Sequence, residues 1–196
     1  MKTQDHLKFN ILQIIFKPLI FGLDTIPGLM IYTFVALGLW SLGIHGPNLL
    51  GGITTPIFLA NIAANMKAFQ AGQTVPHEVA DGFWTLFQNI GGSGATLGLV
   101  IAMLFAKSKS YRELGKLAIS PAIFCINEPI IFGFPIVMNP VMAIPFIGTP
   151  MLLGASTMVL MKVGLIGKIV LQVPWTTPPI IGPYLATNGN IGAAIW

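Results

Sequence analysis

The 196-residue chain has few charged side chains, because Asp, Glu, Lys and Arg together make up only 8% of it. A soluble domain carries about a quarter charged residues, so the sequence excludes an ordinary water-soluble globular protein. Hydrophobic residues make up 54% of the chain, and its mean hydropathy is +0.80. We expect an all-α membrane protein with transmembrane helices, since lipid requires every backbone polar group to be satisfied within the protein.

Cysteine is scarce as well, with Cys125 as the one example in the sequence. A single cysteine excludes an intramolecular disulfide and a CxxC metal site. The sequence also lacks a His, Cys and carboxylate cluster with metal-ligand spacing. The glycine-rich run at 91–98 lacks the spacing and the following Lys-Ser/Thr of a nucleotide loop. We therefore expect no metal, no cofactor and no ATP.

The net charge of +4 does not indicate nucleic-acid binding, because the basic residues lie in short runs between apolar segments. Positive charge in short loops instead marks the cytoplasmic side of a membrane protein. The densest run predicts a cytoplasmic loop, and its residues are Lys107, Lys109, Arg112 and Lys116.

Windows with little charge define the organisation of the chain, since a membrane-spanning helix needs about 20 mostly apolar residues. Residues 1–22 carry lysines and read as an amphipathic or linker segment, and residues 23–196 read as the membrane domain. The windows in that domain are residues 25–44, 46–66, 82–106, 117–161 and 169–196.

The second window is a poor continuous helix, because prolines and glycines crowd its first eleven residues. A parity argument points the same way. If the N-terminus and the basic loop are both cytoplasmic, the span at 25–44 takes the chain out and the span at 83–106 brings it back. The window between them must then enter and leave the membrane on the same side. We therefore predict that 46–66 is re-entrant, and the broken window at 117–161 supplies a second re-entrant helical hairpin.

Each broken segment places an ionisable residue shortly before a proline, His45 before Pro47 and Glu128 before Pro129. Proline is favoured in the first turn of a helix, so both residues should lie at helix N-termini. Pairs of broken segments point to a transporter binding site near the midplane. We predict that the two residues form opposite walls of one site, although a capping role for Glu128 and a packing role for His45 stay open.

Aromatic residues near these breaks favour a sugar over an ion as the ligand. Trp40 precedes His45 by five residues, and Trp175 lies in an irregular proline-rich stretch. Flat indole faces suit the C–H faces of a pyranose ring, and Asn127 adds amide groups for hydroxyls. The alternative for each tryptophan is the interfacial belt, which we favour for Trp84 and Trp196.

Three motifs then resemble the membrane-embedded IIC component of phosphotransferase-system sugar permeases, in the lactose, cellobiose and chitobiose branch. They are LWSLGIHG at 39–46, INEPIIFGFPIVMNP at 126–140 and VPWTTPP at 173–179. The resemblance covers nearly the whole chain and implies a group translocator in a bacterial cell membrane. There a disaccharide would be phosphorylated at its 6-hydroxyl by a phosphocysteine on a cytoplasmic IIB partner, which makes the chain part of a protein-phosphocysteine–sugar phosphotransferase system.

The resemblance also implies roles for the site residues. Glu128 would bind and deprotonate the hydroxyl, and His45 would hold the sugar near the phosphoryl path. The substrate-binding set would be Trp40, Gly43, His45, Asn127, Glu128 and Trp175. The implied partners are the disaccharide, the IIB component and indirectly IIA, membrane lipid and, for the complete protein, a second copy in a homodimer, with no nucleic acid.

Length separates this chain from complete family members, which are roughly twice as long and which begin with an N-terminal membrane half. The chain resembles the C-terminal half alone. Two alternatives therefore stay open beside the permease. One is a truncated remnant that binds nothing, and the other is a cation-coupled sugar carrier in which Glu128 is a proton site.

Overall fold

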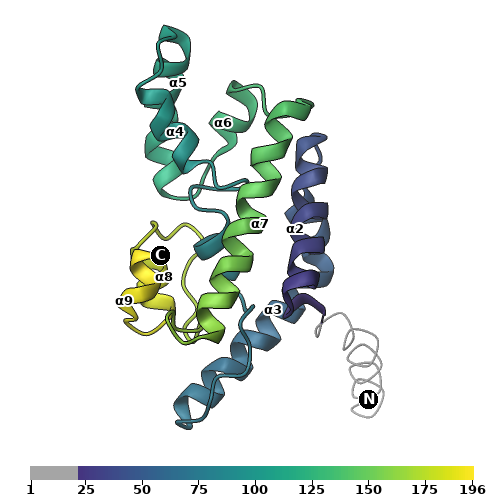
Figure 1. Ribbon diagram of the computed structural model, residues 1–196, viewed down its shortest axis with the longest axis vertical. Coiled ribbons are helices and arrows are strands. Elements are labelled where there is room, and N and C mark those ends of the chain that lie inside the picture. The colour runs from purple at the N-terminus through teal and green to yellow at the C-terminus, as the bar shows by residue number, and fades with distance from the viewer. Residues whose placement is uncertain (1–21) are drawn as a thin grey trace, which may run out of the picture.

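The computed structural model describes residues 22–196, which are helical and contain no β-strand in that range (Figure 1). The expectation of an all-α fold is confirmed for this part of the chain. The segment expected at 1–22 lies almost wholly outside it. The elements are α2 (Ile26–Ser41), α3 (Gly46–Gln70), the π-helix η1 (Trp84–Gln88), α4 (Leu97–Leu104), α5 (Lys109–Ile123), α6 (Glu128–Gly133), α7 (Pro140–Lys162), α8 (Ile181–Ala186) and α9 (Ile191–Ile195).

Helices α2 and α7 form the centre of the fold and run antiparallel along each other (Figure 1). At one end, the Met138 amide just before α7 donates to the Ser41 carbonyl at the end of α2, at 2.7 Å. Towards the other end, Leu29 of α2 and Met158 of α7 share a buried cluster. The π-helix η1 packs against α7, and its Gln88 side chain donates to Thr33 of α2 and to the Pro150 carbonyl of α7.

Helix α3 is continuous over 25 residues and runs back along α2, so the prediction of a break within 46–66 is wrong. Pro47 lies in the first turn, where its missing N–H costs nothing. Pro56 lies inside the helix, which continues past it because Ile57, Asn61 and further residues of this face are buried against neighbouring segments. At ~37 Å, α3 is long and apolar enough to cross a membrane, as is α7.

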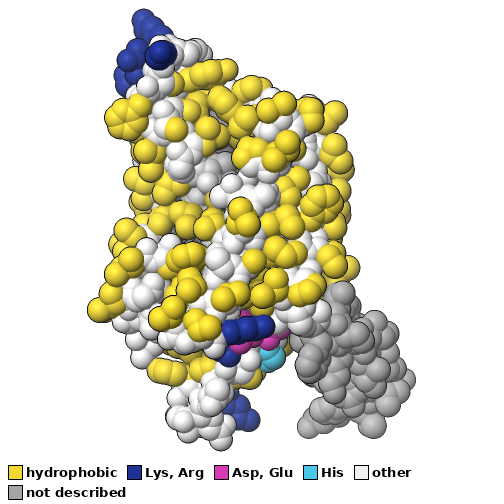
Figure 2. Space-filling model, viewed as in Figure 1, with side chains coloured by type: hydrophobic (Ala, Val, Ile, Leu, Met, Phe, Trp, Pro, Cys, Tyr) yellow, Lys and Arg dark blue, Asp and Glu magenta, His cyan; other side chains and the backbone are white. Residues whose placement is uncertain are grey.

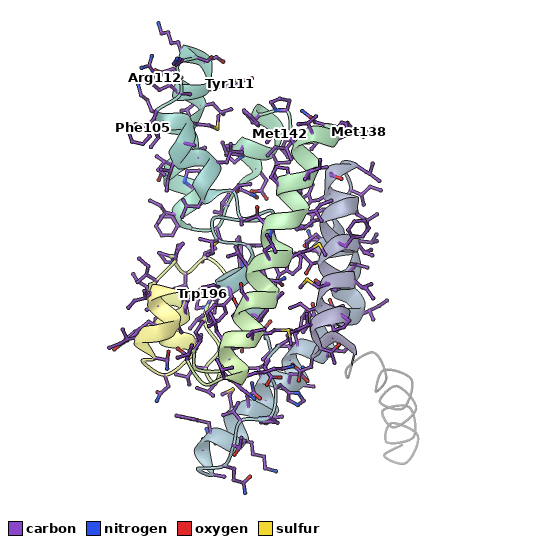
Figure 3. The ribbon with its side chains drawn as sticks, in the orientation of Figure 1. Phe105, Tyr111, Arg112, Met138, Met142 and Trp196 are labelled. Carbon is purple, nitrogen blue, oxygen red and sulfur yellow. The ribbon has the colours of Figure 1, made fainter. Side chains whose placement is uncertain are left out.

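The basic run and the start of α2 lie at opposite ends of the molecule (Figure 1). Figure 3 places Arg112 and Tyr111 at the tip between α4 and α5, and Figure 2 shows Lys and Arg side chains gathered there. Three segments, α2, α3 and residues 84–104, connect Gly22 to this tip. The parity argument for 46–66 assumed that the N-terminus lies on the same side as the basic loop, and the N-terminal residues 1–21 lie outside the described range.

Helices α5 and α6 form the second predicted break. Gly133 at the end of α6 lies against Leu114 near the start of α5, so the two helices are antiparallel. The chain reverses at Phe124–Asn127, where Cys125 has a positive φ of 61°. Helices α4 and α5 pack tightly through Gly115, which faces Met103. The Glu128 segment is therefore a helical hairpin, as expected.

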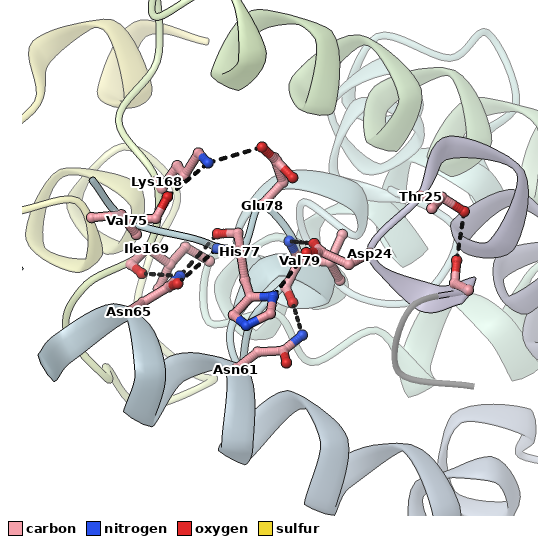
Figure 4. Close-up of polar contacts among 11 residues, drawn as sticks. Asp24, Thr25, Asn61, Asn65, Val75, His77, Glu78, Val79, Lys168 and Ile169 are labelled. Atoms are coloured by element: carbon pink, nitrogen blue, oxygen red, sulfur yellow. Dashed lines mark hydrogen bonds and ion pairs between the residues drawn. The ribbon is translucent and has the colours of Figure 1, made fainter. Parts of the chain in front are cut away.

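A polar cluster joins distant segments (Figure 4), and Figure 2 shows acidic, histidine and basic side chains gathered at the end of the molecule opposite the basic tip. Asp24 accepts from the Val79 amide at 2.7 Å and contacts His77 Nδ1 at 2.9 Å. Lys168 pairs with Glu78 at 2.9 Å and donates to a carbonyl of the same loop. These bonds hold the loop between α3 and η1 against the start of α2 and the segment after α7.

Candidate functional site

His45 is the N-cap of α3, as its position before Pro47 predicted. Its Nδ1 accepts a hydrogen bond from the Asn48 amide at 3.2 Å. A backbone amide can only donate, so the neutral imidazole carries its proton on Nε2. The half-buried His45 ring therefore has an N–H donor left for a ligand.

Trp40 packs beside His45, with ring centroids 4.5 Å apart and an interplanar angle of 47°. The indole is buried, with 4% of its surface exposed, and its Nε1–H has no hydrogen-bond partner among the described residues. On its other side, Trp40 meets Phe132 of α6 edge-on at 6.1 Å. Trp40 therefore links the first break to the helix that begins at Glu128.

Glu128 is the first residue of α6, as Pro129 predicted, and its side chain is exposed. It forms no hydrogen bond or ion pair with other residues in the described range. Asn127 before it is buried and donates from Nδ2 to the Ser93 carbonyl at 2.6 Å and to Thr96 Oγ1 at 2.8 Å. Both amide hydrogens are therefore used within the protein, which leaves Oδ1 as the free polar atom of Asn127.

The two breaks lie at the same end of the molecule. The segment that follows α6 contacts the turn between α2 and α3, because Met138 bonds to Ser41 and a side chain at Gly43 would meet Val137 at 3.5 Å. Figure 3 shows Met138 beside the end of α2. The packing of Trp40 on Phe132, one turn after Glu128, adds a second contact between them.

A cavity of about 550 Å³ lies next to the first break, within the range of known small-molecule sites. Its walls come from α2, α3, the loop before η1, η1 and the segment before α8, and they mix aromatic rings with hydroxyl, amide and carboxylate groups. His45 and Glu128 are not wall residues, but Pro47 is, so the cavity reaches the first turn of α3. Its aromatic and polar walls include Tyr32, Thr54, Thr55, Phe58, Asp81, Trp84, Thr85, Gln88, Gln172 and Trp175.

Trp175 lines the cavity, and 59% of its surface is exposed. Trp84 also lines the cavity and packs edge-on against Tyr32 at 5.0 Å, and its place in an interfacial belt stays a prediction. Trp196 donates from Nε1 to Thr157 in α7 at 2.7 Å.

Asp81 and Gln172 were missed by sequence reasoning, and they join across the cavity wall. Gln172 Nε2 donates to Asp81 Oδ2 at 2.7 Å, although the two residues are 91 positions apart. No local motif surrounds either residue. One signal in the sequence points to Asp81: its carboxylate has no basic residue beside it and directly precedes a window of low charge.

Comparison with known proteins shows the family of the chain. The family model described as "Phosphotransferase system, EIIC" matches residues 6–150. The chain belongs to this EIIC family. It is 42% identical to the PTS system cellobiose-specific EIIC component of Geobacillus stearothermophilus, over 91% of this chain and 41% of that protein. It is 36% identical to the PTS system lactose-specific EIICB component of Lacticaseibacillus casei, over 89% of this chain and 30% of that protein.

A solved structure extends the likeness of this EIIC chain to three dimensions. The transporter ChbC, the IIC component from the N,N'-diacetylchitobiose-specific phosphotransferase system, superposes with a TM-score of 0.90. It is 41% identical, over 95% of this chain and 44% of that one. The expected family and branch are thus confirmed, and EIIC proteins are membrane permease components. The chain spans between 30% and 44% of the length of these relatives.

Proposed function

We propose that this chain supplies the sugar-binding half of a permease that takes up a β-linked disaccharide and releases it phosphorylated. The observation that carries the proposal is the position of His45 and Glu128 at two helix starts whose flanking segments pack together, where the cavity lined by Trp84 and Trp175 reaches the first turn of α3. The names of the cellobiose and chitobiose relatives support a disaccharide.

In this proposal, the sugar lies in the cavity with its reacting hydroxyl toward the two breaks. Glu128 accepts the proton of that hydroxyl as its oxygen forms a bond to phosphorus, and the P–S bond to the cysteine of IIB breaks to release a thiolate. Glu128 suits this role because no protein donor occupies its carboxylate within the described residues. The His45 Nε2–H stabilises negative charge on the transferring phosphoryl group.

Other predicted residues position the sugar. Trp40 orients the His45 ring by packing on it, and Gly43 allows the close turn between α2 and α3, where its φ of 87° favours glycine. Asn127 holds the Glu128 break against Ser93 and Thr96 and offers Oδ1 to a hydroxyl. Trp175 stacks on the sugar from the opposite wall.

We further propose a multi-pass arrangement in a bacterial cell membrane with the basic tip in the cytoplasm. Both breaks lie at the end of the molecule that carries this tip (Figure 1), so a cytoplasmic IIB component could approach them. The EIICB name of the lactose relative supports an IIB partner. Contacts with lipid, and a homodimer of the complete protein, follow from the same proposal.

The test measures phosphorylated disaccharide in membrane vesicles that contain the full chain and an IIB partner charged with phosphate. We expect product with the wild type and a loss of at least about 100-fold with Glu128→Gln, which cannot accept the proton. Glu113→Gln is the matched control, because Glu113 forms an exposed pair with Lys116 at the basic tip. Product formation by Glu128→Gln at the wild-type rate would refute the assigned role.

The same vesicles separate the two alternatives. A cation-coupled carrier would deliver unmodified sugar, with uptake that depends on membrane potential and not on IIB. A remnant that binds nothing would give no phosphorylated product, and the purified chain in detergent would show no rise in melting temperature with sugar.

A further inference from the structure

Asp81 and Gln172 form the polar end of the cavity that is farthest along α3 from His45. The Asp81 amide donates to the Phe58 carbonyl at 3.1 Å, and Phe58 lies eleven residues after Pro47 on α3. Eleven residues of α-helix span ~16 Å. This distance is longer than one hexose ring, so a sugar that reacts at the His45 end reaches Asp81 and Gln172 only with a second ring.

The pair has hydrogen-bonding groups to spare. The bond from Gln172 Nε2 to Asp81 Oδ2 leaves Asp81 Oδ1, Gln172 Oε1 and the second Nε2 hydrogen without a recorded partner in the described part of the chain. Two acceptors and one donor side by side match the alternating hydroxyl groups of a pyranose ring. Trp84 and Trp175 follow Asp81 and Gln172 by three residues each and add aromatic surface.

The charge of Asp81 also favours a neutral, hydroxyl-rich ligand. The neighbouring cation, Lys168, is already paired with Glu78 and with the Val75 carbonyl (Figure 4). No Lys, Arg or His within residues 22–196 forms an ion pair with Asp81. Hydroxyl donors supply charge-assisted hydrogen bonds to such a carboxylate without adding another charge.

Both residues are held in place by their backbones. Asp81 is tied to α3 through Phe58, and the preceding loop is fixed by Asn61 and Asn65, which bond to Val79 and His77. On the other side, the Val170 and Leu171 amides both donate to the Ala186 carbonyl of α8, at 2.8 and 3.0 Å. The position of the pair is therefore set before any ligand arrives, which favours recognition of a defined hydroxyl pattern.

We propose that Asp81 and Gln172 bind the disaccharide ring that is not phosphorylated and so determine which disaccharide the protein accepts. This inference rests on the proposed function, because it assumes that the cavity holds the sugar. It assigns specificity to residues that lie outside the motifs at His45 and Glu128.

The test compares cellobiose with glucose on the purified full chain in detergent, by isothermal titration calorimetry. Asp81→Asn keeps the size of the side chain but removes its charge and one acceptor, and Gln172→Ala removes the amide. We expect each variant to raise the Kd for cellobiose at least about tenfold, while the Kd for glucose, which fills the reacting end alone, changes less than twofold. Glu113→Gln, at the basic tip, should leave both values unchanged.

The ratio of the two Kd values distinguishes recognition from a structural role, since a misfolded cavity would lose both sugars together. Equal weakening of cellobiose and glucose, or no change in the Kd for cellobiose, overturns the inference and leaves the proposed function standing. Cellobiose binding that requires a sodium ion or a proton bound at Asp81 also overturns the inference. A wild-type chain that binds neither sugar refutes the proposed function and the inference with it.

Discussion

Gly154 leaves room for the Gln88 side chain, which bonds to both α2 and α7. We call these two bonds the central clamp, and a methyl group at position 154 should break them. Gln88 of η1 is fully buried, and its Nε2 donates to Thr33 Oγ1 of α2 at 3.0 Å and to the Pro150 carbonyl of α7 at 3.1 Å. A carbonyl only accepts, so the nitrogen of the amide must face Pro150. The Cβ of an alanine at 154 would overlap this nitrogen.

The cost of Gly154→Ala follows from these contacts. The two buried hydrogen bonds contribute about 0.5–1.5 kcal/mol each, and forced overpacking costs about 1–3 kcal/mol. Alanine in a helix interior regains about 1 kcal/mol relative to glycine. We expect a net loss of about 1–5 kcal/mol in the free energy of unfolding, and at the central value of about 3 kcal/mol the melting temperature falls by about 6–12 °C.

Gly148→Ala is the matched control, because it lies on α7 six residues earlier and an added Cβ there meets nothing within 4 Å. It should leave the melting temperature unchanged or raise it slightly. Thermal unfolding in one detergent, followed by tryptophan fluorescence, measures both variants. In a Gln88→Ala background the effect of Gly154→Ala should largely disappear. Equal melting temperatures for the two glycine variants would refute the clamp.

Two further substitutions test the polar contacts that shape the site, both by thermal unfolding in detergent. Asp24→Ala removes the acceptor for Val79 and His77 and should cost about 1.5–3 kcal/mol, whereas Glu113→Ala, in an exposed pair, should cost less than about 1 kcal/mol. Similar effects would contradict a structural role for Asp24. Asn127→Ala loses both hydrogen bonds to the glycine-rich loop and should cost about 1–3 kcal/mol, and an unchanged melting temperature would show that the loop does not need them.

The starts of the site helices were predictable because they depend on local chemistry. A proline in the first turn and a capping group before it define a helix start over four or five residues. His45 and Glu128 therefore lie where the sequence placed them. The family motifs around them added their expected roles.

The course of α3 was not predictable from the same kind of signal. Counting prolines and glycines predicted a break at 46–66, but Pro47 lies in the harmless first turn. Pro56 is accommodated because Ile57 and Asn61 on this helix are buried against other segments. Propensity is a weak guide where tertiary packing compensates for a lost backbone hydrogen bond.

The composition of the chain was enough to determine a helical membrane protein, since too few charges exist to solvate its surface. The motifs were enough to place the ionisable residues at helix starts. Only the tertiary structure joined Asp81 to Gln172, placed Gln88 between α2 and α7, and assembled the cavity walls. These contacts cross 55 to 91 positions of the chain, and no local pattern records which distant segments will pack together.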